Sequence, residues 1–140
     1  MEDTPHTHIE EFIKAFIIKE RQERMLYLFN GSIKNKRKLE DQFLHELPID
    51  SKYVAKSFEN LKRDDAIRAF QEFLATKKVP EKCVVWSNKY PLTDDVRFGN
   101  AIESIKENMG LTDSVYSFIP GKLAFYTNDY GGQSCFLIKK

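Results

Sequence analysis

The sequence lacks a long hydrophobic run, an excess of charge of either sign, and a dense set of cysteines. Its longest unbroken apolar run, Met25–Phe29, is far shorter than the ~20 residues that cross a bilayer. Lys and Arg total 22 and Asp and Glu total 21, which argues against a basic nucleic-acid coat protein and an acidic disordered tail. The first five residues are acidic where a secretory or mitochondrial leader is basic. These absences predict a soluble globular domain with no membrane partner.

The two cysteines, Cys83 and Cys135, both stand within apolar runs. Small secreted proteins carry denser, even-numbered cysteine sets, so two isolated thiols are typical of a reducing cytoplasm. We therefore expect a cytoplasmic protein. The spacing of the two cysteines leaves open whether they are neighbours on a sheet.

Hydrophobic residues make up 41% of the 140-residue chain and aromatic residues 13%, enough to fill the core of one domain. Helical spacing of apolar residues dominates the first half and predicts three helices. Their starts are Thr4-Pro5 or Thr7 for the first, Ser32 for the second, and Asp64 or Asp65 for the third. The apolar stripe of the first drifts beyond Lys19, which indicates a bend or break within Lys19–Arg24. A short helical turn is expected at residues 53–58.

The pattern changes at Cys83. Cys83–Ser87 is typical of a buried strand, and Thr93 or Asp94 is expected to start a fourth helix with Phe98 on its buried face. Three further strands are predicted at Ser114–Ile119, Leu123–Thr127 and Cys135–Lys139. The fold class is therefore α+β, with a helical part at roughly 7–78 packed on a small βαβββ sheet at roughly 83–139. We interpret 1–140 as a single domain, with a looser division near residue 80 as the alternative.

The motifs of metal and catalytic sites are incomplete. His45-Glu46 begins like a zinc-protease helix, but Ile49 stands where the second histidine belongs. His6-x-His8 is interpreted as part of a solvated N-terminal extension. The sequence contains no Cys-x-x-Cys pair, nucleotide-binding glycine loop or Gly-x-Ser-x-Gly elbow. We expect no catalytic residue, metal ligand or cofactor.

One candidate site is the loop after the first strand of the second half. Asn88, Tyr90, Asp94 and Asp95 lie between a strand and the expected helix start, where many α/β proteins bind ligands. These side chains would suit a small polar ligand, in a sensor or a small enzyme. The aspartates are equally explained as capping residues of the following helix.

A second candidate is the basic start of the second helix, formed by Lys34, Lys36, Arg37 and Lys38. Cations oppose the helix dipole there, so an anionic partner such as a phosphate or carboxylate would offset their repulsion. The alternative is a solvated face in which Lys36–Glu40 and Arg37–Asp41 pair along the helix.

The third feature is an excess of tyrosine. Tyr116 and Tyr126 fall on neighbouring predicted strands and Tyr130 in the turn that follows. On one open face they would form a platform suited to a protein partner. The alternative is that helices cover them.

The segment Ile119-Pro120-Gly121-Lys122-Leu123-Ala124-Phe125-Tyr126, with the turn and strand that follow it, resembles the ending of a group of short uncharacterised bacterial proteins. The basic runs Lys19–Arg24 and Lys34–Lys38 are similar to the front part of the same group. The resemblance covers about a third of the chain. It implies a bacterial, cytosolic origin and carries no activity.

These observations favour a non-catalytic cytosolic binding protein that recognises a protein partner, in an antitoxin-, immunity- or adaptor-like role. The alternative is a nucleic-acid or phosphate binder that uses the basic start of the second helix. A third hypothesis is a ligand sensor or enzyme built on the 87–95 loop.

Overall fold

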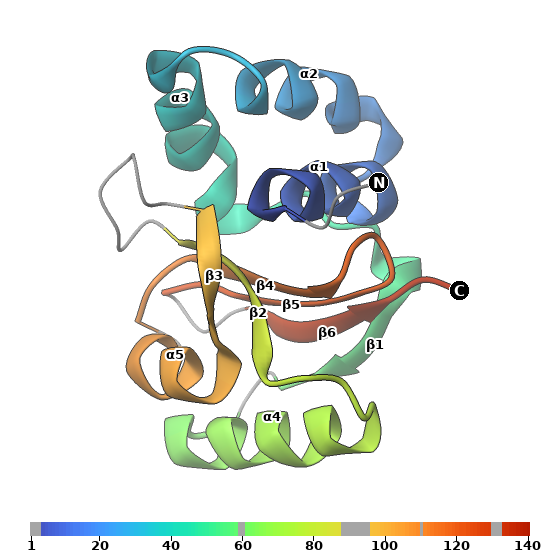
Figure 1. Cartoon of the computed structure of the whole chain (residues 1–140), viewed down its shortest axis with the longest axis vertical. Coiled ribbons are helices and arrows are strands. Elements are labelled where there is room, and N and C mark those ends of the chain that lie inside the picture. Colours follow the sequence, from blue (N-terminus) through green and yellow to red (C-terminus); the bar gives the residue numbers. More distant parts are fainter. Residues whose placement is uncertain (1–3, 59–60, 88–95, 110, 130–132) are drawn as a thin grey trace.

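The computed structural model describes residues 4–58, 61–87, 96–109, 111–129 and 133–140. Within them, an antiparallel sheet lies between two layers of helices (Figure 1). The helices are α1 (Pro5–Phe16), α2 (Lys19–Phe29), α3 (Ile33–Phe43), α4 (Arg63–Thr76) and α5 (Ala101–Asn108), with the 3-10 turns η1 (Leu44–Glu46) and η2 (Ser51–Tyr53). The strands are β1 (Val54–Ser57), β2 (Lys82–Ser87), β3 (Val96–Asn100), β4 (Ser114–Ile119), β5 (Leu123–Thr127) and β6 (Ser134–Ile138). None of the helices formed by the described residues is long and apolar enough to cross a membrane.

The strand order is β1-β6-β5-β4-β2-β3, and every neighbouring pair is antiparallel. Helices α1 to α3 lie on one face of the sheet, while α4 and α5 lie on the other (Figure 1). Successive side chains of a strand point to opposite faces, so Trp86 joins the core beneath α1 and Val85 joins the core beneath α5. The central strands are buried along almost their whole length because both of their faces are covered.

The α+β class is confirmed, as are the strands Ser114–Ile119 and Leu123–Thr127. The predicted break in the first helix occurs at Ile17 and Ile18, just before the expected range. Both residues are extended there, Ile18 N donates to Pro48 O at 2.8 Å, and Ile17 forms an isolated bridge with Ile49. The break is stabilised by a segment 30 residues away, which local spacing does not reveal.

Two predicted elements are wrong. The expected fourth helix begins later, because Val96–Asn100 is a strand at the edge of the sheet and Phe98 lies in it. Asn100 then caps α5, its Oδ1 accepting from Glu103 N at 3.0 Å. Residues Val54–Ser57 form β1 rather than a helical turn, because they pair with β6. The sheet therefore has six strands in place of the four predicted, and the helices cover both of its faces.

The tyrosine platform is also wrong. Tyr116 and Tyr126 are fully buried, and they point to opposite faces of the sheet. The Tyr126 hydroxyl donates to Leu44 O, and the Tyr116 hydroxyl accepts from Asn108 Nδ2 at 3.2 Å. Tyr130 lies outside the described residues.

Cys83 and Cys135 are both free and buried, and β4 and β5 separate their strands. Cys83 belongs to the core under α4 and α5, whereas Cys135 belongs to the core under α1 to α3. Burial raises the pKa of the Cys83 thiol to about 12. A thiol with so high a pKa is a poor nucleophile at neutral pH, so Cys83 acts as a core residue.

Candidate functional site

The loop predicted as a ligand site is mostly outside the described residues. This applies to Asn88, Tyr90, Asp94 and Asp95. The residue before them, Ser87, is described and fully buried at the end of β2. Its hydroxyl accepts a hydrogen bond from Ser114 Oγ at 2.9 Å.

Ser87 belongs to a row of buried hydroxyls that the sequence does not reveal. Ser87, Ser114, Thr127 and Ser134 are register partners across β2, β4, β5 and β6. Thr127 Oγ1 and Ser134 Oγ lie 2.9 Å apart, and Thr112 Oγ1 lies 2.8 Å from Ser114 Oγ. Each residue ends or begins a strand, but only the strand register aligns them on one face. Hydrogen bonds within the row give these buried hydroxyls partners at the edge of the core under α4 and α5.

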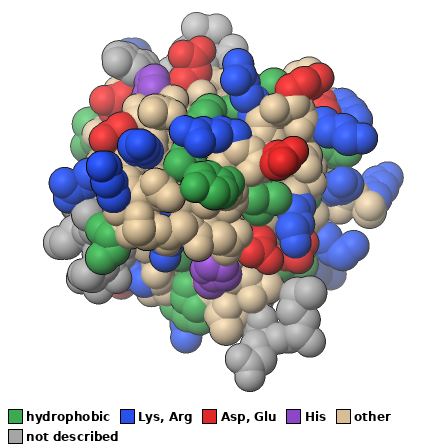
Figure 2. Space-filling view, turned by 90° about the horizontal axis from the view of Figure 1, so that it is seen from above, with side chains coloured by type: hydrophobic (Ala, Val, Ile, Leu, Met, Phe, Trp, Pro, Cys, Tyr) green, Lys and Arg blue, Asp and Glu red, His purple; other side chains and the backbone are tan. Residues whose placement is uncertain are grey.

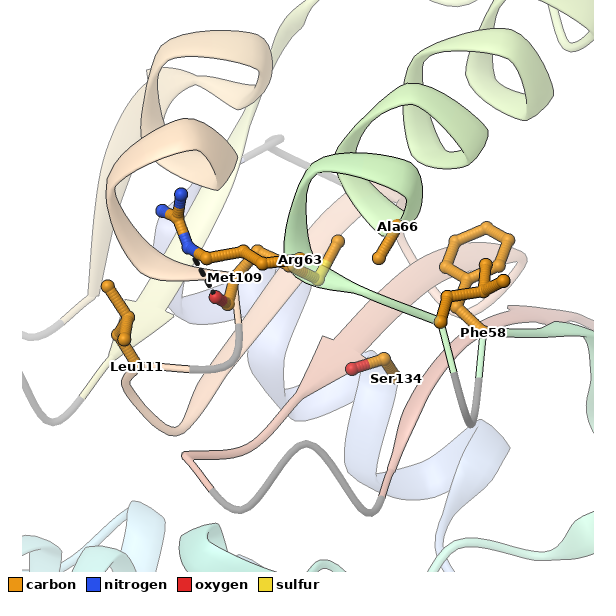
Figure 3. A pocket seen from close by; sticks show the side chains of 7 residues that line it. Phe58, Arg63, Ala66, Met109, Leu111 and Ser134 are labelled. Atoms are coloured by element: carbon orange, nitrogen blue, oxygen red, sulfur yellow. Dashed lines mark hydrogen bonds between the residues drawn. The ribbon is translucent and has the colours of Figure 1, made fainter.

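A pocket of about 180 Å³ adjoins this row (Figure 3). Ser134 lies at its floor, with Leu111 and the Arg63 guanidinium on one side and Phe58 on the other. Arg63 Nε donates to Met109 O at 3.1 Å, and its Nη2 donates to Lys106 O. Those carbonyls end α5, where a cation also complements the helix dipole. The guanidinium therefore acts as a helix cap at the edge of a small, mainly apolar hollow.

The interpretation of both N-terminal histidines as a solvated extension is wrong for His8. Helix α1 begins at Pro5, with Thr4 as its cap, so His8 falls on the buried face of the helix. His8 Nδ1 lies 2.7 Å from Ser117 Oγ, and the ring contacts Phe98 edge-on. His6 is exposed and stacks on Phe29 instead, so the two imidazoles have different surroundings. No group of three metal-binding side chains occurs among the described residues.

The basic start of the second predicted helix is the start of α3. Ser32 caps it, its Oγ accepting from Asn35 N at 3.2 Å. Lys34, Arg37 and Lys38 are exposed, and Lys36 Nζ lies 5.8 Å from the centre of the Phe29 ring. The alternative, in which Lys36–Glu40 and Arg37–Asp41 pair along the helix, stays a prediction.

The same helical hairpin exposes two large apolar side chains. Tyr27 on α2 is 63% exposed, and Ile33 at the first turn of α3 is 58% exposed. The Arg24 guanidinium lies 6.0 Å from the centre of the Tyr27 ring. Figure 2 views the molecule from the side of α2 and α3, where cationic, acidic and apolar side chains intermingle. We call Arg24, Tyr27, Ile33, Lys34, Lys36, Arg37 and Lys38 the hairpin surface.

Comparison of the chain with protein-family models, with curated proteins and with solved structures finds no match.

Proposed function

We propose that the protein is a non-catalytic binding protein that recognises an acidic surface of a partner protein through the hairpin surface. The observation that carries the proposal is the exposure of Tyr27 and Ile33 within a basic setting. Neither side chain belongs to the core, to which the same hairpin contributes Met25, Leu28 and Phe29.

The residue types of the hairpin surface suit a protein interface. Tyr and Arg are enriched among the side chains that contribute most to binding between proteins, where an aromatic ring enters a pocket of the partner. Arg24 lies against Tyr27 and would hold the ring in place. Five of the seven residues of the hairpin surface are cations, so an acidic partner surface would complement them, and opposite charge accelerates association.

Among the described residues, the Cys83 thiol and the hydroxyls of the sheet have structural roles. The Cys83 thiol is buried and has a raised pKa, and the buried hydroxyls of the sheet bond to one another. We place the protein in the reducing cytoplasm of a bacterium, in an antitoxin-, immunity- or adaptor-like role.

The experiment compares the wild-type chain with Tyr27→Asp/Ile33→Asp and with the control Leu111→Asp. Leu111 is 60% exposed but lies beside the Arg63 pocket, so the control adds the same kind of charge elsewhere. Each tagged chain is used to capture proteins from host extract, and each captured protein is then purified and titrated. Loss of an aromatic anchor and an aliphatic neighbour weakens binding about 30-fold or more.

The proposal requires a captured protein that the wild type and Leu111→Asp bind with equal affinity. The variant Tyr27→Asp/Ile33→Asp should no longer bind that protein. Its affinity should also fall as salt screens the cations. A partner that binds all three chains alike would place the interface elsewhere and refute the proposal.

A second candidate is nucleic-acid or phosphate binding by the start of α3. The observation that favours it is that Lys34, Lys36, Arg37 and Lys38 lie within the first two turns of α3, at the positive end of the helix dipole. The variant with all four residues changed to Glu should then lose retention of single- and double-stranded nucleic acid at low salt. Retention that is unchanged and insensitive to salt would exclude this candidate.

A further inference from the structure

A hollow of about 320 Å³ lies between α1, the β4–β5 turn and the end of β6. Figure 1 shows this end of the molecule at the right, where the β4–β5 turn lies near α1 and the chain ends after β6. Lys14, Lys122, Lys139 and Lys140 line the hollow, and Glu11 is the acidic side chain in the described lining. The turn belongs to the Ile119–Tyr126 segment, which is not part of the hairpin surface.

Backbone hydrogen bonds fix the main chain at two lysines of the hollow, Lys122 and Lys139. Gly121 has a φ of +69°, a conformation that favours glycine, and it directs the turn toward α1. Lys122 N donates to Ile119 O at 3.0 Å, which closes the turn. Lys139 N donates to Lys122 O at 2.9 Å, which places these two lysines side by side.

The charge of the hollow is poorly compensated. Lys14 Nζ lies 3.5 Å from Glu10, but the ion pairs found within the described ranges include none with Lys122, Lys139 or Lys140. Lys139 Nζ lies 5.1 Å from the centre of the Tyr53 ring. Lys52 Nζ lies 5.2 Å from the same centre, outside the lining of the hollow, and pairs with Asp50 Oδ2 at 3.5 Å. Cations from distant parts of the chain thus converge, and their repulsion falls when an anion enters.

We propose that this hollow binds an oligophosphate group, carried by a free polyphosphate or by a nucleotide. Each ammonium offers three donors to phosphate oxygens, and a chain of two or three phosphates spans several lysines at once. A volume of about 320 Å³ exceeds what a single phosphate needs. The proposal is independent of the hairpin surface, whose residues it does not use.

The test is calorimetric titration of the full chain with phosphate, pyrophosphate and tripolyphosphate. Affinity should rise with the number of phosphates and fall between about 50 mM and about 300 mM salt. The variant Lys122→Gln/Lys139→Gln should weaken tripolyphosphate binding about tenfold or more, because two charge-assisted contacts are lost. The control Lys34→Gln/Lys38→Gln removes the same charge from α3 and should leave the affinity within about twofold.

A titration with ATP distinguishes the two sources of the phosphates. Affinity equal to that of tripolyphosphate identifies the phosphates alone as the ligand, whereas tighter binding identifies a nucleotide whose base adds contacts. Amide shifts in NMR spectra should cluster at Gly121, Lys122 and Lys139. Absence of tripolyphosphate binding at millimolar concentration would overturn the proposal. An equal loss of affinity in Lys122→Gln/Lys139→Gln and in the control Lys34→Gln/Lys38→Gln would do the same. Unfolding curves of both variants establish that each is folded.

Discussion

The hydroxyl of Tyr126 is predicted to hold the helical layer on the sheet. It lies on β5, donates to Leu44 O and accepts from Leu47 N at 3.4 Å, so one hydroxyl serves both ends of η1. Tyr126, Leu44 and Leu47 are all fully buried or nearly so. The change Tyr126→Phe keeps the ring and removes only this oxygen.

The expected loss follows from the groups left behind. The Leu44 carbonyl and the Leu47 amide lose a buried partner, and an unsatisfied buried polar group costs about 1–3 kcal/mol. The bond to Leu47 is long, so we expect about 2 kcal/mol in the free energy of unfolding. With an m-value of about 2 kcal/mol/M in urea, the midpoint of unfolding falls by about 1 M.

The assay is urea unfolding followed by circular dichroism, with Tyr27→Phe as the control. Tyr27 loses the same oxygen but is largely exposed, so its midpoint should stay unchanged. The m-value should not change in either variant, because neither alters the area exposed on unfolding. If Tyr126→Phe and Tyr27→Phe have the same midpoint as the wild type, the hydroxyl does not connect the two layers.

Three further predictions concern a helix cap, a buried carboxyl and the two cysteines. Arg63→Ala should lower the free energy of unfolding by about 1 kcal/mol, because the α5 carbonyls lose their cationic cap, and urea unfolding against Arg68→Ala checks it. Burial raises the pKa of Asp113 above its ordinary value of 3.8, so ionisation destabilises the fold as pH rises through the folded-state pKa. Asp113→Asn should therefore exceed the wild type in stability at pH 7 and match it below the ordinary value; an equal stability at both pH values would contradict this. Finally, a thiol reagent at pH 8 should modify Cys83 and Cys135 only after unfolding, since both are buried, and rapid modification of the native chain would disprove their placement.

Local chemistry explains the elements that sequence reasoning predicted well. Ser32 and Thr4 are capping residues, and each caps the helix that follows it. The turn at Pro120-Gly121 separates two apolar runs, and the structure places β4 and β5 on either side of it. These signals act over a few residues, so the neighbouring sequence is sufficient to specify them.

The failures occur where a partner distant in sequence decides the conformation. Val54–Ser57 is a strand because β6 offers it a free edge, and nothing within the segment distinguishes it from a turn. Phe98 has helical neighbours in Ala101 and Ile105, but pairing of its strand with β2 overrides that spacing. His8 changes from a terminal polar residue to a buried one because α1 begins at Pro5, with Thr4 as its cap.

The candidate sites divide in the same way. The cations of α3 are visible in the sequence, whereas the exposure of Tyr27 and Ile33 beside them depends on which face of each helix the core covers. The lysines of the hollow are separated by up to 126 positions, from Lys14 to Lys140, and only the folded chain brings them together. The hydroxyl row requires the register of four strands.

The sequence by itself determined the α+β class, the starts of α1 and α3, and the two strands around the Pro120-Gly121 turn. Capping, turn chemistry and apolar periodicity act over a few residues, so the neighbouring sequence specifies them. Only the tertiary structure decided that the sheet has six strands with helices on both faces, which tyrosines are buried, and which lysines share a hollow. Those features depend on hydrogen bonds and packing between segments distant in the chain, and such contacts exist only once the sheet has formed.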